Sequence, residues 1–217
     1  MKLYLASYRI PDLQTLVELV GKQPGNIKVA LIPNAKDYYA PRARAVKIRL
    51  VLQALRQAGL HATVVDLHEY RRAPVKLATR LKQFDLLWVM GGNTFCLREA
   101  MQQSGFDKIV RDVLDSGVVY AGESAGACVA GTDLRGIEYA DDPEYAEKVI
   151  WKGLRLTEHY IVPHADNPDF GPLSARIIAE RGADPTMVVL NDNQAWVVNG
   201  NDAWRVTGIK PDEMVDA

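Results

Sequence analysis

One short segment of the sequence places a serine, whose hydroxyl can act as a nucleophile, among small residues. Gly122-Glu123-Ser124-Ala125-Gly126 matches the pattern G-x-S-x-G, in which a serine lies on a sharp turn between a strand and a helix. An apolar run, residues 118–121, precedes this motif, and small residues that can begin a helix follow it. Adjacent strands crowd such a turn, so small residues are needed there, and glycine also tolerates unusual backbone angles. We therefore predict that Ser124 is a nucleophile, the alternative being a tight strand–helix junction without catalysis.

A glycine pair after another apolar run could help to stabilise a reaction intermediate. Gly91-Gly92-Asn93-Thr94 follows residues 86–90, and glycines at such a place let a backbone N–H approach a ligand closely. A donor from this loop and the N–H of Ala125 would together form an oxyanion hole, in which loss of one donor typically costs about 3 kcal/mol of barrier. Thr94 also has the position of a helix N-cap. The loop lacks the glycine spacing and the lysine of phosphate-binding motifs.

A serine nucleophile needs a base, and the chain has four histidines: His61, His68, His159 and His164. Active groups of parallel α/β sheets lie beyond the carboxyl ends of the strands. His164 is the best placed of the four, because it ends the extended segment 160–162.

A triad also needs an acid that accepts the other imidazole N–H and so fixes the tautomer. The acidic residues between the serine and the histidine are Asp133, Glu138, Asp141 and Asp142. Residue types and spacing leave the choice among them open.

The elements that must position these groups alternate along the chain. Apolar segments predict strands, and amphipathic segments between them predict helices, at residues 12–20, 48–58 and 106–116. Strands that are apolar along their whole length are typical of a parallel sheet buried on both faces, joined by right-handed crossovers. A turn signal at residues 199–202 predicts a terminal hairpin. We expect one α/β domain over residues 1–217, a three-layer sandwich with a mostly parallel central sheet. The expected strands are residues 3–6, 27–32, 62–67, 85–90, 118–121, 160–162, 187–190, 195–198 and 203–206.

Composition excludes several classes of protein. The chain has 26 basic and 27 acidic side chains, so it shows no electrostatic signature of a nucleic-acid-binding protein. No apolar stretch reaches the roughly 18 residues of a membrane span, and the first residues do not read as a secretory leader. Cys96 and Cys128 have no paired or ligand-type spacing, which favours free thiols in a reducing compartment. We predict a cytoplasmic protein without cofactor; a homodimer is compatible with the sequence.

Taken together, these motifs resemble a known family. GGNTF, GESAGA, an acidic loop and the Pro163-His164 pair, in this order, resemble the peptidase E (dipeptidase E-like) serine peptidases, whose wider circle includes cyanophycinase. The resemblance implies a fold related to class I glutamine amidotransferases, and exopeptidase action on dipeptides without a metal. It also implies that Ser124 is the nucleophile, His164 the base, and Gly92 and Ala125 the oxyanion donors.

Two positions depart from that family's pattern. The best-known members have an aspartate about fifteen positions after the serine, where this chain has Tyr139. We predict that the adjacent Glu138 is the triad acid, with Asp141 as second choice. The aspartate-selective members have an arginine after the histidine, where this chain has Leu173, with Arg176 one helical turn on. Selectivity for N-terminal aspartate is therefore not predicted.

The sequence thus predicts a serine peptidase that hydrolyses short peptides through an acyl-enzyme. One alternative is a catalytically idle protein that binds a small molecule or a peptide on the same fold. Another is an esterase or amidase that uses the same serine.

Overall fold

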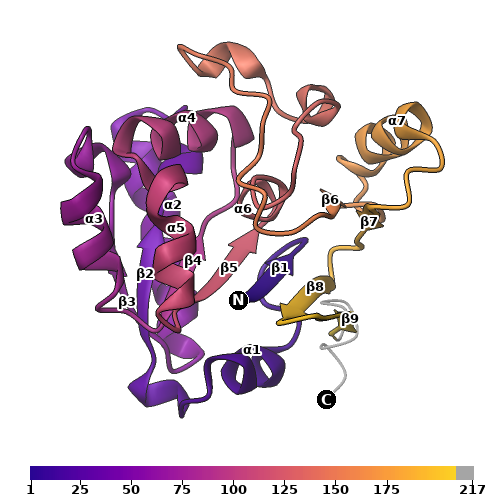
Figure 1. Cartoon of the computed structure of the whole chain (residues 1–217). Helices are drawn as coiled ribbons and strands as arrows, with labels where there is room; N and C mark the ends of the chain where they lie inside the picture. The colour runs from indigo at the N-terminus through magenta and orange to yellow at the C-terminus, as the bar shows by residue number, and fades with distance from the viewer. Residues whose placement is uncertain (209–217) are drawn as a thin grey trace.

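A seven-stranded, mostly parallel sheet forms the centre of the protein (Figure 1). The computed structural model describes residues 1–208, so residues 209–217 of the expected domain lie outside the described residues. The strand order is β3-β2-β4-β5-β1-β8-β9; the first five strands are parallel, and β8 and β9 are antiparallel. The strands are β1 (Lys2–Ala6), β2 (Lys28–Ile32), β3 (His61–Val64), β4 (Leu86–Val89), β5 (Val119–Glu123), β8 (Gln194–Asn199) and β9 (Asp202–Thr207).

Helices cover both faces of this sheet, and the direction of each crossover decides which face. The chain moves from β1 to β2 and β3 in one direction, then returns through β4 to β5 in the other. Right-handed connections in opposite directions place their helices on opposite faces. The connecting helices are α1 (Leu13–Val20) and α2 (Pro41–Gln57) on one face, and α3 (Pro74–Leu81), α4 (Thr94–Ser104) and α5 (Phe106–Asp115) on the other.

The strands are apolar throughout because each face of the sheet has its own core. In β1, Leu3 and Leu5 belong to the larger apolar cluster with α3, α4 and α5, whereas Tyr4 and Ala6 belong to the cluster with α1 and α2. Successive strand residues point to opposite faces, so both sets of side chains must be apolar. This arrangement confirms the prediction of a three-layer α/β sandwich with a mostly parallel central sheet.

A smaller, two-stranded parallel sheet follows in the last third of the chain. It consists of β6 (Tyr160–Val162) and β7 (Met187–Val189), joined through α7 (Gly171–Arg181). Figure 1 shows this unit beside the tips of β5 and β1. Its apolar residues belong to the same cluster as those of α4 and α5, and we interpret the described residues as one domain.

Two local predictions were wrong in detail. The expected third strand ends at Val64 rather than residue 67, because Asp66 accepts the N–H of His68 and caps a 3-10 helix, Leu67–Tyr70. Thr94 is not the N-cap of α4. Asn93 has that role, since its side-chain oxygen accepts the N–H groups of Phe95 and Cys96, each at 3.0 Å.

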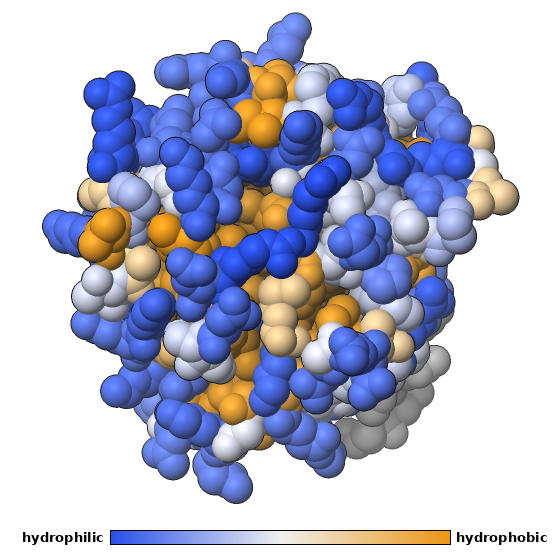
Figure 2. Space-filling view, in the orientation of Figure 1, coloured by the Kyte–Doolittle hydropathy of each residue, from blue (hydrophilic) through white to orange (hydrophobic). Residues whose placement is uncertain are grey.

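The surface seen in Figure 2 is hydrophilic over most of its area, with apolar areas near its centre. Cys96 and Cys128 are buried free thiols, as the sequence predicted. Across residues 1–208, none of the helices has the length and apolar character that crossing a bilayer requires.

A close backbone contact joins Gly126 to β4. A methyl group at this position would lie 2.3 Å from the carbonyl oxygen of Val89, a backbone atom that cannot rotate away. We expect Gly126→Ala to lower the free energy of unfolding by about 1–3 kcal/mol, the usual cost of overpacking. Urea denaturation monitored by circular dichroism measures this loss.

Gly25→Ala is the matched control, because a methyl group there would meet no atom within 4 Å. We expect its stability to stay within about 0.5 kcal/mol of wild type. Equal denaturation midpoints for the two variants would contradict the packing argument.

Candidate active site

Ser124 lies on a strained turn at the end of β5. Its backbone angles are φ 51° and ψ −112°, a conformation that non-glycine residues rarely adopt. The turn is held because the Ser124 N–H donates to the carbonyl of Ala6 on β1 at 3.0 Å. A methyl group on Gly122 would lie 2.3 Å from the carbonyl oxygen of Gly126, so neither the strand nor the following helix, α6 (Ala125–Cys128), has room for larger residues there. The motif glycines are thus required by packing.

The structure brings His164 to this serine. The Nε2 atom of His164 lies 2.9 Å from Ser124 Oγ, where it can accept the hydroxyl proton. His164 follows β6 and also has a positive φ, 63°. Its backbone N–H donates to Ser7 Oγ at 2.8 Å, which anchors the loop beside the end of β1. The residue is buried, and the rings of Tyr8 and Phe170 lie beside the imidazole, with centroids 6.1 and 5.2 Å away.

Asp192, which the sequence reasoning did not consider, is the carboxylate that contacts His164. Its Oδ1 atom lies 2.5 Å from His164 Nδ1, so Nδ1–H can donate to it. The second oxygen, Oδ2, accepts from the side-chain amide of Asn167 at 2.7 Å. The backbone N–H of Asp192 donates to Asp166 at 2.8 Å. Both carboxylate oxygens and the backbone of Asp192 are therefore fixed.

The residue that we predicted as triad acid, Glu138, has a different partner. Its carboxylate accepts the backbone N–H of Gly136 at 2.5 Å, within its own turn. The second choice, Asp141, accepts both the backbone N–H and the hydroxyl of Thr94, at 2.9 and 2.5 Å. The structure therefore does not pair either of these carboxylates with His164.

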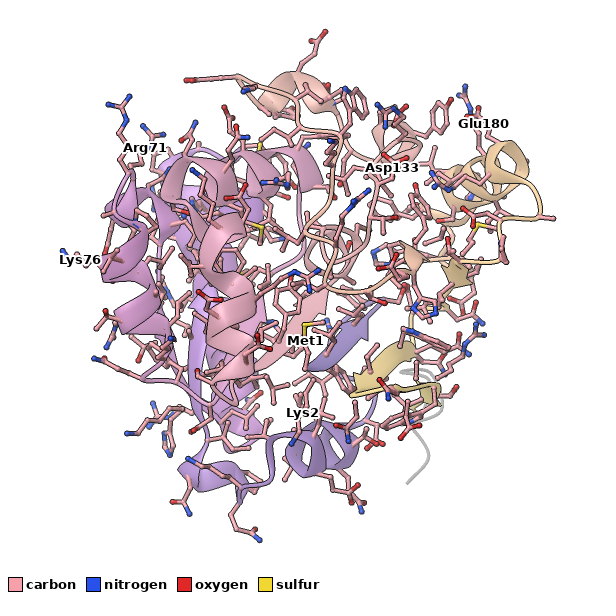
Figure 3. The ribbon with its side chains drawn as sticks, in the orientation of Figure 1. Met1, Lys2, Arg71, Lys76, Asp133 and Glu180 are labelled. Carbon is pink, nitrogen blue, oxygen red and sulfur yellow. The ribbon has the colours of Figure 1, made fainter. Side chains whose placement is uncertain are left out.

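The other acidic candidates and the tyrosine at the family's aspartate position also lie elsewhere. Asp133 pairs with Arg135, and Asp142 caps the short helix Pro143–Tyr145. The hydroxyl of Tyr139 donates at 2.7 Å to Glu180, which lies on α7 at the periphery of the molecule (Figure 3).

The pairing of β6 with β7 explains why Asp192, although it follows His164 by 28 residues in the chain, contacts its imidazole. The two strands are parallel, with Val162 opposite Val189. Residues that follow the two strands by similar distances therefore meet, and His164 and Asp192 are two and three residues beyond these positions. The signal in the sequence was the polar run Asn191-Asp192-Asn193 directly after an apolar strand.

The predicted oxyanion donors lie next to the nucleophile. Ala125 is the first residue of α6, where a backbone N–H has no acceptor within the helix. Gly92 lines the same pocket as Ser124 and has φ 142°. A methyl group on Gly92 would lie 2.2 Å from the carbonyl oxygen of Ala35, so only glycine fits at this point of the loop.

Ser124 and His164 open onto a pocket of about 500 Å³. Its lining is mixed: aromatic rings (Tyr8, Tyr38, Tyr39, Tyr145, Phe170), acidic side chains (Glu123, Asp141, Asp142, Asp169), polar residues that include Asn93 and Asn167, and Lys36. The volume falls in the range of pockets that hold small organic ligands.

Burial shifts the pKa values of three charged groups in this pocket. It raises the pKa of the Glu123 carboxyl, against the Gly91 N–H and the positive charge of Lys36, which lower it. Burial also raises the pKa of Asp141, against its two hydrogen bonds from Thr94. The pKa of Lys36 is lowered by burial. Perturbed groups that gather in one cleft are typical of functional sites.

Within the described part of the chain, no group of three or more histidine, cysteine, aspartate or glutamate side chains is arranged to hold a metal ion. The chemistry that the geometry offers is that of the serine and the imidazole.

Comparison with known proteins identifies the family. The sequence model of peptidase family S51 matches residues 7–206. The chain belongs to peptidase family S51. It is therefore a serine hydrolase of the peptidase class.

Several proteins are similar to this S51 peptidase along much of their length. The uncharacterized peptidase Lin0382 of Listeria innocua is 30% identical over 147 residues, which cover 67% of this chain and 69% of that protein. Peptidase E of Haemophilus influenzae is 28% identical over 158 residues, 72% of this chain and 65% of that protein. A crystal structure of a protein from Listeria monocytogenes EGD-e that is assigned to peptidase E superposes with a TM-score of 0.80 at 22% identity, covering 95% of this chain and 98% of that one. The similarity to this crystal structure shows that the two proteins share a fold.

Arg176, one helical turn beyond the position at which the aspartate-selective members of the family have an arginine, is engaged elsewhere in this S51 peptidase. The Arg176 guanidinium lies 3.7 Å from the centre of the Tyr139 ring and pairs with Glu180 on its own helix. Neither Arg176 nor Leu173 is among the residues that line the pocket.

The contacts of His164 predict which carboxylate supports the reactivity of Ser124. Asp192→Asn keeps the shape but removes the negative charge next to the imidazole. We expect it to slow labelling of Ser124 by a fluorophosphonate probe by at least about 100-fold, since the corresponding change in a Ser-His-Asp triad lowers kcat about 10⁴-fold. The measurement is the second-order labelling rate, followed by mass spectrometry.

Glu138→Gln serves as the control, since an amide oxygen can still accept the Gly136 N–H. We expect it to label like wild type. The assignment of Asp192 fails if Glu138→Gln is the slow variant and Asp192→Asn labels normally.

Proposed function

We propose that this S51 peptidase is a serine exopeptidase that hydrolyses short peptides through a triad of Ser124, His164 and Asp192. The observation that carries the proposal is one continuous hydrogen-bonded path, from Asp192 Oδ1 to His164 Nδ1 at 2.5 Å and from His164 Nε2 to Ser124 Oγ at 2.9 Å. A nucleophile, a base and a group that orients the base are the three elements of this chemistry.

In the proposed reaction, Ser124 Oγ attacks the carbonyl carbon of the scissile peptide bond while His164 Nε2 takes the hydroxyl proton. The resulting oxyanion accepts hydrogen bonds from the N–H groups of Gly92 and Ala125. His164 gives its proton to the leaving amine, and the C–N bond breaks to leave an acyl-enzyme on Ser124. Water then attacks the ester, with His164 again as base, and releases the acid product and the serine. Asp192 stabilises the imidazolium in both halves.

The size of the pocket supports a short substrate, and the names of the relatives support a peptide. A pocket of about 500 Å³ accommodates a few residues. Peptidase E of Haemophilus influenzae, whose name marks it as a peptidase, is similar over 72% of this chain, which supports a peptide bond as the bond that is hydrolysed. The alternative of an idle binding protein would be favoured if His164 had no carboxylate beside its imidazole. The contact of Asp192 with His164 Nδ1 argues against it.

The proposed function predicts that the Ser124 hydroxyl is required both for labelling by a fluorophosphonate and for hydrolysis of dipeptides. We expect Ser124→Ala to abolish fluorophosphonate labelling and to reduce dipeptide hydrolysis by at least about 10⁴-fold, with unchanged folding. A panel of dipeptides that begin with aspartate, glutamate, alanine or leucine, assayed by release of free amino acids, measures the second effect.

A simple ester assayed beside the panel separates the esterase alternative. Hydrolysis of the ester without turnover of any dipeptide would replace the proposal by that alternative. Absence of both activities in a folded wild-type protein would instead support the idle binding protein.

A further inference from the structure

Glu123, the residue immediately before the nucleophile, has a carboxylate whose hydrogen bonding is incomplete. The hydrogen bond that the described residues give it is one from the Gly91 N–H to Oε1, at 3.2 Å. The other oxygen, Oε2, receives no hydrogen bond from residues 1–208, and the side chain lines the catalytic pocket. A desolvated carboxylate with one long hydrogen bond is costly to maintain.

No cation of the described chain touches this carboxylate. Lys36 is the one lysine or arginine among the pocket-lining residues, and it forms no ion pair within 4 Å with Glu123 or with Asp141 in residues 1–208. Its charge acts on both carboxylates only at longer range. Its stem lies beside Gly92, where a built methyl group would meet Lys36 Cδ at 3.1 Å. Glu123 therefore keeps an acceptor oxygen available to a ligand.

The position of Glu123 relative to Ser124 restricts which part of a peptide can reach it. A methyl group built on Gly91 would lie 3.0 Å from Ser124 Cβ and 3.5 Å from Glu123 Cγ, so the two side chains leave the backbone around the same glycine. In a peptide whose first carbonyl is attacked, the α-nitrogen is separated from the carbonyl carbon by one atom, Cα. The first charged group beside the attacked carbonyl is therefore the N-terminal ammonium.

We propose that Glu123 binds the α-ammonium group of the residue whose carbonyl Ser124 attacks, and that it makes the enzyme specific for peptides with a free N-terminus. This inference rests on the proposed peptidase function and assigns the specificity-determining residue of its site. The ammonium donates to Oε2 of Glu123 while Oε1 keeps its bond to Gly91. Three further carboxylates line the pocket, those of Asp141, Asp142 and Asp169, and they strengthen the negative potential that favours a cation.

A purely structural role for Glu123 predicts different behaviour. In that case the carboxylate only holds the Gly91–Gly92 loop through the Gly91 N–H. Glutamine has the same shape and a carbonyl oxygen that can accept this N–H, but it has no negative charge. Glu123→Gln therefore preserves the structural role and removes the electrostatic one.

The experiment measures binding in the absence of turnover. Ser124→Ala protein is titrated by calorimetry with dipeptides that begin with alanine, leucine or aspartate, and with the N-acetylated form of each. We expect the best free-amine dipeptide to bind about 10- to 100-fold more tightly than its acetylated form, the range of a charge-assisted hydrogen bond. In the double variant Ser124→Ala/Glu123→Gln, we expect this preference to fall to less than about 3-fold.

Glu18→Gln on the same Ser124→Ala background is the control, because it removes one negative charge from an exposed site on α1. We expect it to retain the preference. The proposal is overturned if no free-amine dipeptide binds more tightly than its acetylated form, or if Glu123→Gln leaves the preference intact.

Turnover and labelling of proteins that keep Ser124 test the peptidase function separately. A wild-type enzyme that hydrolyses acetylated and free dipeptides equally well would retain the proposed function and lose this inference. A protein that binds free-amine dipeptides selectively, but is neither labelled by the probe nor able to hydrolyse dipeptides, would retain this inference and lose the proposed function.

Discussion

The backbone turn at Ser124 is the constraint on which the rest of the site depends. A non-glycine residue at φ 51° and ψ −112° costs on the order of 1–3 kcal/mol and persists only where the surroundings fix it. Here the surroundings are the parallel strands themselves, because the Ser124 N–H bonds to β1 and Gly126 packs on the carbonyl of Val89 in β4. Two strands from different parts of the chain thus hold the nucleophile, and the core that covers both faces of the sheet supplies the stability.

His164 and Asp192 are held by a second, smaller unit, and one buried hydroxyl joins that unit to the end of β1. Ser7 lies just beyond β1; its Oγ accepts the backbone N–H of His164 and donates to the carbonyl of Leu190 at 3.4 Å. The N–H of Ala165 bonds to the same carbonyl at 3.0 Å. The end of β1 therefore positions the nucleophile through Ala6 and the imidazole through Ser7. This shared anchor explains how elements forty residues apart in the chain meet at 2.9 Å.

Local pattern predicted most of the fold, because each strand and helix carries its own periodicity and turn residues. It also selected Ser124 and His164 as candidate site residues, because both follow apolar strands and parallel sheets place their active groups there. The partner of His164 was missed for a physical reason. The sequence prediction covered carboxylates between Ser124 and His164, whereas the contact of Asp192 with His164 depends on the register of β6 with β7. Pairing between strands is a long-range property that residue types alone do not give.

Two acidic side chains near the imidazole show how hydrogen bonding separates roles within one site. Both carboxylate oxygens of Asp192 accept a hydrogen bond within the protein, one from the imidazole Nδ1–H and one from the Asn167 amide. Among residues 1–208, Glu123 has one hydrogen-bond donor, the Gly91 N–H, and burial raises the pKa of its carboxyl. A carboxylate that accepts hydrogen bonds on both oxygens can orient a neighbouring side chain. A carboxylate at a cavity wall that still has a free acceptor oxygen is stabilised further when a cationic ligand binds. The number of protein donors on each carboxylate therefore separates the proposed orienting role of Asp192 from the proposed ligand-binding role of Glu123.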